Sequence, residues 1–139
     1  MASGSASKFA SRGLTVTVEN NTTTSFRATA TDHAGNASPC SAERTYVEDS
    51  TKPQTTITSG PSGNTTDDTP TFEFQSSESG STFLCRFDSQ PFDSCSGPGA
   101  SHTPSGSLSL GTHTFEVQAT DQAKNTDPTP AKSTFTVTP

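Results

Sequence analysis

Short runs in which apolar and polar residues alternate recur along the second half of the chain. In the run TFEFQ at 71–75, alternation places Phe72 and Phe74 on one side of an extended strand. The run TFLCRF at 82–87 repeats this pattern and leaves Leu84 on the opposite side. Further strands are predicted at 54–58, 107–110, 113–120 and 133–137. Gly, Pro, Asn or Asp bounds each run and no helical period occurs, so the pattern predicts an all-β fold of six to seven strands. An antiparallel β-sandwich is expected, because two half-polar sheets bury their Phe-bearing faces against each other.

One segment of the chain occurs twice. The sequence ATATDHAGN at 28–36 returns as VQATDQAKN at 117–125. At a single ungapped offset of 89 positions the identical pairs include Phe26/Phe115, Thr31/Thr120, Asp32/Asp121, Asn36/Asn125, Pro39/Pro128 and Thr45/Thr134. A period near 90 residues matches one β-sandwich domain. We therefore predict a complete repeat over 51–139 and the C-terminal half of a preceding repeat over 13–50.

The partial repeat is expected to contain three strands. They are predicted at 14–18, 26–30 and 44–47, and a three-stranded remnant with an apolar face is marginal by itself. Either the chain was excised from a longer repeat protein, or a neighbouring chain supplies the missing strands and the copies join into a filament. Residues 1–12, which begin MASGSAS, are predicted to be a disordered leader.

The cysteines indicate an oxidising compartment. Cys85 and Cys95 flank RFDSQPFDS, whose centre is predicted to be a turn between two short strands, and such a hairpin brings two cysteines within disulfide reach. Two buried free thiols are the alternative, but a domain with a thin core gains much from a covalent link. Cys40 has no evident partner, which leaves a free thiol, an intermolecular bridge or a partner upstream in a parent protein.

Composition narrows the classes of partner. Only 26% of residues are hydrophobic, there are nine Phe and no Trp, and the net charge is −6. Nucleic acid and anionic membrane surfaces are disfavoured, because the eight Lys and Arg are scattered. No run approaches the roughly 20 apolar residues of a membrane helix, so membrane insertion is not expected.

The repeat sequences resemble a known family. The segments PQTTITSGPSGNTTDDTPTFEF, STFLCRFDSQPFDSC and GTHTFEVQATDQAKNTDPTPAKSTFTV are similar to the bacterial immunoglobulin-like repeats of large secreted and surface-anchored proteins. This resemblance covers nearly all of 13–139 and implies an immunoglobulin-like sandwich that serves in spacers and adhesive stalks. Lys124 departs from the family, which favours Gly at this position as in Gly35 of the first copy. If the position requires positive φ, Lys carries a small strain there.

Two interpretations apply to the repeated acidic turn. Asp121 and Asn125, like Asp32 and Asn36 in the first copy, suit a structural turn in which a carboxylate accepts backbone N–H groups. No cofactor is required by this interpretation. The alternative is calcium bound by hard oxygens near the linker, with the candidate ligands Asp32, Asn36, Glu48 and Asp49.

No catalytic constellation can be assembled from the sequence. His33, His102 and His113 are separated, the side of the sheet that His113 faces is left undecided, and no G-x-S-x-G motif occurs. We expect a non-catalytic structural or spacer module of a secreted or cell-surface protein, located outside the cell, that contributes to adhesion or presentation beside neighbouring repeats or like chains. The alternatives are the self-assembling filament subunit and an adhesin domain whose loop 96–106 binds a protein or glycan.

Overall fold

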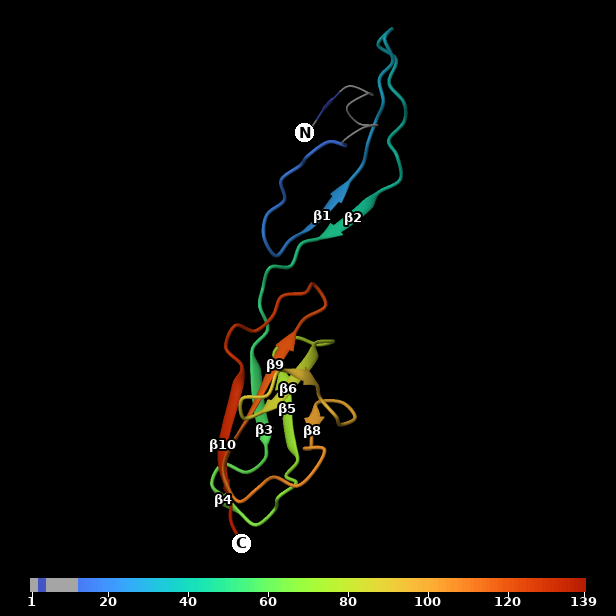
Figure 1. The fold of residues 1–139 in the computed structure, drawn as a ribbon. Coiled ribbons are helices and arrows are strands. Elements are labelled where there is room, and N and C mark those ends of the chain that lie inside the picture. Colours follow the sequence, from blue (N-terminus) through green and yellow to red (C-terminus); the bar gives the residue numbers. More distant parts are fainter. Residues whose placement is uncertain (1–2, 5–12) are drawn as a thin grey trace. The chain divides into compact units, whose positions relative to one another are not determined.

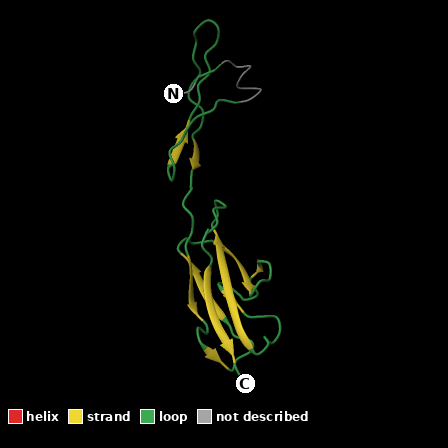
Figure 2. Cartoon of the chain, turned by 60° about the vertical axis from the view of Figure 1, so that its left-hand side comes forward, coloured by secondary structure: helices red, strands yellow, loops and turns green. Residues whose placement is uncertain are grey.

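The structure is a computed structural model that describes residues 3–4 and 13–139. The chain divides into two compact units, Met1–Ser50 (unit 1) and Thr51–Pro139 (unit 2). Most of the predicted leader, at 1–2 and 5–12, lies outside the described residues. The described parts of both units contain strands, turns and loops without a helix, which confirms the predicted all-β class (Figure 2).

Unit 2 is built from two sheets. The larger has the order β4-β10-β9-β6-β7 and the smaller has the order β3-β5-β8 (Figure 1). All pairs are antiparallel except β10 with β4. The strands are β3 (Thr55–Ser59), β4 (Asn64–Thr65), β5 (Phe72–Ser76), β6 (Thr82–Phe87), β7 (Asp93–Ser94), β8 (Ser101–His102), β9 (Gly111–Thr120) and β10 (Ala131–Val137).

Phenylalanine fills the space between the two sheets. Phe72 of β5 stacks on Phe115 of β9, with ring centroids 4.2 Å apart, and also contacts Phe135 of β10 at 5.5 Å. The buried set is Phe72, Phe74, Cys85, Phe115, Val117, Phe135 and Val137. These are the inward positions that alternation predicts, while Leu84 of β6 is 40% exposed. Burial of aromatic area on alternate positions therefore holds the two layers together.

The chain between β8 and β9 differs from the prediction. Residues 107–110, SLSL, alternate but form no strand. Leu108 packs against the core and donates its N–H to the Asp68 carbonyl at 2.8 Å, whereas Leu110 is exposed. Alternation alone does not make a strand when no neighbouring strand offers a ladder of hydrogen bonds.

The described part of unit 1 contains one antiparallel pair, β1 (Thr23–Phe26) with β2 (Arg44–Val47). Its register matches that of β9 with β10. Thr24 lies opposite Tyr46, and 89 positions later His113 lies opposite Phe135. The repeat seen in the sequence is thus a repeat of strand register.

The third strand predicted in unit 1, at 14–18, is not formed. The strand predicted at 26–30 is misplaced: β1 spans Thr23–Phe26 and shares Phe26 with that prediction, and residues 27–30 form no strand. In unit 2 the equivalent β9 continues to Thr120 because β6 pairs with its other edge. Among the described residues of unit 1 none is buried, and Tyr46 is 51% exposed. Without a second sheet, these apolar positions have no core to enter.

Candidate functional site

The repeated turn has the same geometry in both copies. In unit 2 the Asp121 carboxylate accepts the Asn125 backbone N–H at 2.8 Å through Oδ1 and the Asn125 side-chain amide at 2.8 Å through Oδ2. In unit 1 Asp32 accepts the same two groups of Asn36, at 2.8 and 2.9 Å. In both copies the Asp N–H also donates to the Asn carbonyl at 3.0 Å. These bonds are what the structural-turn interpretation expects of the four residues.

Hydrogen bonding lowers the pKa of both turn carboxyl groups below the ordinary 3.8. At Asp121, burial opposes ionisation, but the bonds from Asn125 and the turn amides outweigh it. At Asp32 the bonds from Asn36 are the largest cause. Both carboxylates are therefore ionised at neutral pH, and their hydrogen bonds stabilise the turn.

Lys124 occupies the strained position of the turn in unit 2. Its φ is +76°, and the equivalent Gly35 has φ +92°. Left-handed backbone is disfavoured for a residue with a Cβ, so Lys124 carries the strain that its departure from glycine predicts.

The predicted disulfide is present. Cys85 of β6 and Cys95, which follows β7, are bonded, with their Cα atoms 5.2 Å apart. Pairing of Leu84 with Ser94 and of Cys85 with Asp93 sets the two cysteines close together. Cys85 is buried in the core, so the disulfide joins the edge of the larger sheet to the interior. Cys40 is a free, exposed thiol.

The four candidate calcium ligands do not converge. Asp32 and Asn36 bind each other at the turn between β1 and β2. Glu48 follows the other end of β2, where its Oε2 accepts the Asn21 N–H at 2.5 Å, and Asp49 comes next in the sequence. The turn and Glu48 thus lie at opposite ends of one hairpin, and the predicted set is corrected accordingly.

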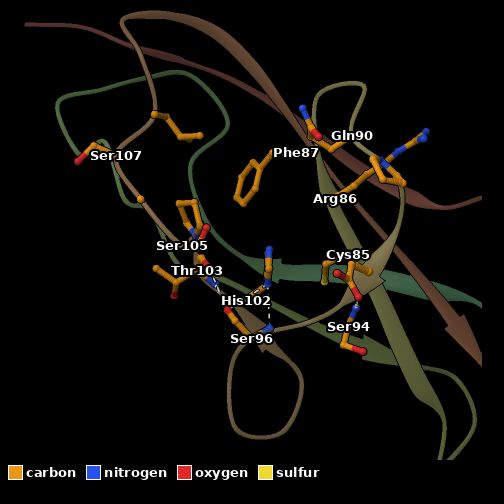
Figure 3. Close-up of a pocket in the computed structure, with 15 residues that line it drawn as sticks. Cys85, Arg86, Phe87, Gln90, Ser94, Ser96, His102, Thr103, Ser105 and Ser107 are labelled. Atoms are coloured by element: carbon orange, nitrogen blue, oxygen red, sulfur yellow. Dashed lines mark hydrogen bonds between the residues drawn. The ribbon is translucent and has the colours of Figure 1, made fainter.

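A groove lies at one edge of unit 2, where the short strands β7 and β8 end the two sheets. Its volume is about 620 Å³. Figure 3 shows Ser107 on one side and Gln90 on the other, with Phe87 and His102 between them. One rim comes from residues 85–94 and the other from 102–108, which overlaps the predicted ligand loop 96–106. The lining mixes hydroxyl-bearing side chains with apolar ones around the rings of Phe87 and His102.

A Ser–His pair lies in this groove, which sequence reasoning did not find. The Ser96 hydroxyl is 3.1 Å from His102 Nδ1, but the Ser96 backbone N–H already donates to that nitrogen at 2.9 Å. The same hydroxyl accepts the Thr103 N–H at 3.1 Å and lies 2.9 Å from the Thr103 carbonyl. Burial lowers the pKa of His102, which favours a neutral ring. Ser96 thus fastens the loop to β8, and the described residues bring no carboxylate to orient the ring as a catalytic base requires.

The Arg86 side chain, which lines the groove, is already paired. Arg86 donates to Glu116 of the neighbouring β9 and places its guanidinium 4.3 Å from the centre of the Phe92 ring. This arrangement fixes the side chain by an ion pair and a cation–π contact at once.

His113, whose orientation the sequence left open, points inward. It is 8% exposed and shares the parity of the buried Phe115. Its Nδ1 is 2.8 Å from Asp88 Oδ2, and its Nε2 is 2.9 Å from the Ser109 carbonyl. The hydrogen bond that His113 donates to the Asp88 carboxylate is the largest cause of a pKa for His113 raised above the ordinary 6.5.

No protein-family model matches the sequence, and no curated protein is significantly similar to it. Among the residues that the structure describes, no helix is long and apolar enough to cross a membrane.

Proposed function

We propose that the chain is a non-catalytic, extracellular structural module of the bacterial immunoglobulin-like repeat kind, which spaces or presents other parts of a secreted or cell-surface protein. The supporting observation is the path of the chain through unit 2. The first strand begins at Thr55, which lies beside Ala119 near the end of β9. The Ala119 N–H donates to the Thr55 hydroxyl at 3.0 Å. Val137 lies opposite Gly111, where β9 begins. The chain therefore enters and leaves unit 2 about 26 Å apart, at a strand rise of about 3.3 Å per residue.

Entry and exit at opposite ends suit a spacer. Modules with this path can be joined end to end, so that each adds its length to the one before. The repeated hairpin register supports tandem copies of one module as the natural context, with neighbouring repeats or like chains as partners. The disulfide is compatible with an extracellular location, where such bonds persist.

A mechanical measurement tests this proposal. The full chain is held by its two ends in a single-molecule force experiment, with and without reductant. We expect unit 2 to open in one cooperative step. The released length should be about 31 Å shorter in the oxidised chain, because a 10-residue span reaches about 36 Å when extended but the disulfide keeps the two Cα atoms 5.2 Å apart. Gradual extension without a step would contradict a load-bearing role.

The groove favours a second candidate, an adhesin domain that binds a protein or glycan through loop 96–106. Its volume and hydroxyl-rich lining provide room and polar groups for a ligand. Glycan and peptide arrays probed with the full chain separate the two candidates. A ligand whose binding is lost in the His102→Ala variant would favour the adhesin. If no glycan or peptide on the arrays binds, the spacer is favoured.

A further inference from the structure

His113 is held by two acceptors at once. Its Nδ1 faces the Asp88 carboxylate and its Nε2 faces the Ser109 carbonyl. Only the protonated imidazolium carries N–H groups on both nitrogens, whereas a neutral ring donates to one partner and turns a lone pair to the other. Both contacts can therefore be hydrogen bonds only when His113 is charged.

The two acceptors belong to the two rims of the groove. Asp88 lies between Phe87 and Gln90, which line one rim, and Ser109 directly follows Leu108, which lines the other. Asp88 is itself fixed to β9, because its Oδ1 accepts the Thr114 N–H at 2.8 Å. Its backbone has φ +52°, a left-handed conformation that aspartate adopts more readily than most residues.

We propose that His113 is a pH-dependent strap which, when protonated, ties the 87–90 turn to the 107–110 segment and holds the rims of the groove together. Loss of the proton removes one of the two hydrogen bonds, so one of the two segments loses its bond to His113 and is held by its remaining contacts. This role is independent of the proposed spacer function, since it concerns the edge of unit 2 and needs no ligand.

The surroundings of the ring support this assignment. β10 presents the Phe135 ring, whose centroid is 5.9 Å from that of His113, and the segment before β9 presents a neutral carbonyl. Among the described residues, the charge that faces the ring is therefore that of Asp88, from the turn after β6. Because the pKa of His113 is raised, the strap is present below pH 6.5 and is lost as the pH rises through the higher folded value.

Residue-resolved NMR on the full, oxidised chain tests the proposal. The imidazole ¹⁵N shifts of His113 are followed from about pH 5.5 to about pH 8.5, together with the amides of Asp88, Gln90, Leu108 and Ser109. We expect all of them to titrate with one midpoint above 6.5. We also expect the amides of the segment that loses its hydrogen bond to exchange about fivefold faster at the upper pH, after correction for the intrinsic pH dependence of exchange, as for the loss of one hydrogen bond. Amides of β5, outside the groove, report global opening and should not change.

Two variants make the result decisive. The His113→Gln variant has no imidazole to ionise, so the amides of the 87–90 turn and the 107–110 segment should show no titration above pH 6.5. Asp88→Asn keeps the imidazole but removes the charged acceptor, so its His113 midpoint should fall below that of the wild type. The proposal is overturned if wild-type His113 titrates at or below 6.5, or if the two segments keep the same pH dependence in His113→Gln.

Discussion

The Asp127 carboxylate is hydrogen-bonded to the backbone of Thr55, so it links the two ends of the unit 2 sequence. Oδ2 of Asp127 accepts the Thr55 N–H at 2.7 Å, although the residues are 72 positions apart. Oδ1 accepts the Thr129 N–H at 2.8 Å, and Asp127 is 1% exposed. Burial raises the pKa of this carboxyl, but the bonds from Thr129 and Thr55 outweigh it and hold the pKa below 3.8. One ionised side chain thus secures the first strand of the sandwich to the loop before the last.

Asp127→Asn should destabilise unit 2 by about 2 kcal/mol, because a buried charged acceptor is lost. Asp67→Asn is the matched control, since Asp67 makes the same turn with Thr69 in an exposed loop and has no distant partner there. Urea unfolding should show little change for the control. The lowered pKa means that the contribution of Asp127 is present above about pH 4 and disappears as the pH falls through the folded value. The difference between wild type and Asp127→Asn should therefore shrink toward about pH 2, and a difference that stays constant would contradict this role.

Removal of the disulfide should also cost stability. The closed loop spans a sequence separation of 10, for which chain-entropy arguments give about 3 kcal/mol. Urea unfolding of the oxidised protein, the reduced protein and the Cys85→Ala/Cys95→Ala variant measures this contribution. Equal urea midpoints for the oxidised and reduced forms would show that the bond does not stabilise the fold.

Lys124→Gly should stabilise unit 2 by about 1 kcal/mol, since glycine adopts positive φ without the clash of a Cβ. The Lys124→Ala variant distinguishes the contribution of backbone strain to stability from that of the lysine side chain. It keeps the strained Cβ, so its melting temperature should stay near that of the wild type. If both variants are stabilised alike, the lysine side chain and not the backbone is responsible.

Gly60→Ala should be among the most damaging single substitutions. Gly60 has φ +133°, and a Cβ there would collide with the ring of the buried Phe72. We expect a loss of about 3 kcal/mol, the size of a core overpacking combined with backbone strain. Gly63→Ala, with open space and no positive φ, should unfold close to the wild type in the same thermal scan.

The sequence predicts the parts of the fold that depend on local pattern. Alternation places Phe72, Phe74 and Phe115 inside, because strand geometry fixes which side each residue faces. The repeat predicts that Asp32 and Asp121 form equivalent turns, since the bonds involved span only a few residues. The disulfide follows from a short hairpin whose strand pairing sets the two cysteines close together.

The parts of the fold and of the candidate site that the sequence does not predict depend on contacts between segments distant in the sequence. The bond from Asp127 to Thr55 crosses 72 positions and leaves no local signal. The groove exists because β7 and β8 both end early at one edge, which no strand pattern specifies. The inward position of His113 follows from local pattern after all, because His113 lies two residues before the buried Phe115 on the same side of β9. The unformed strand at 14–18 has the right pattern but no partner, and pairing is not encoded by alternation.

The central claim is that the chain holds one complete sandwich with a core, together with a second copy of its C-terminal hairpin that has none. Residue-resolved amide hydrogen exchange on dilute, oxidised protein tests this most directly. We predict that amides of β5, β6, β9 and β10 exchange only through global unfolding, while those of β1 and β2 exchange close to the rate of an unprotected chain. Equal protection of β1, β2 and the strands of unit 2 would contradict the claim, because unit 1 would then have a core of its own.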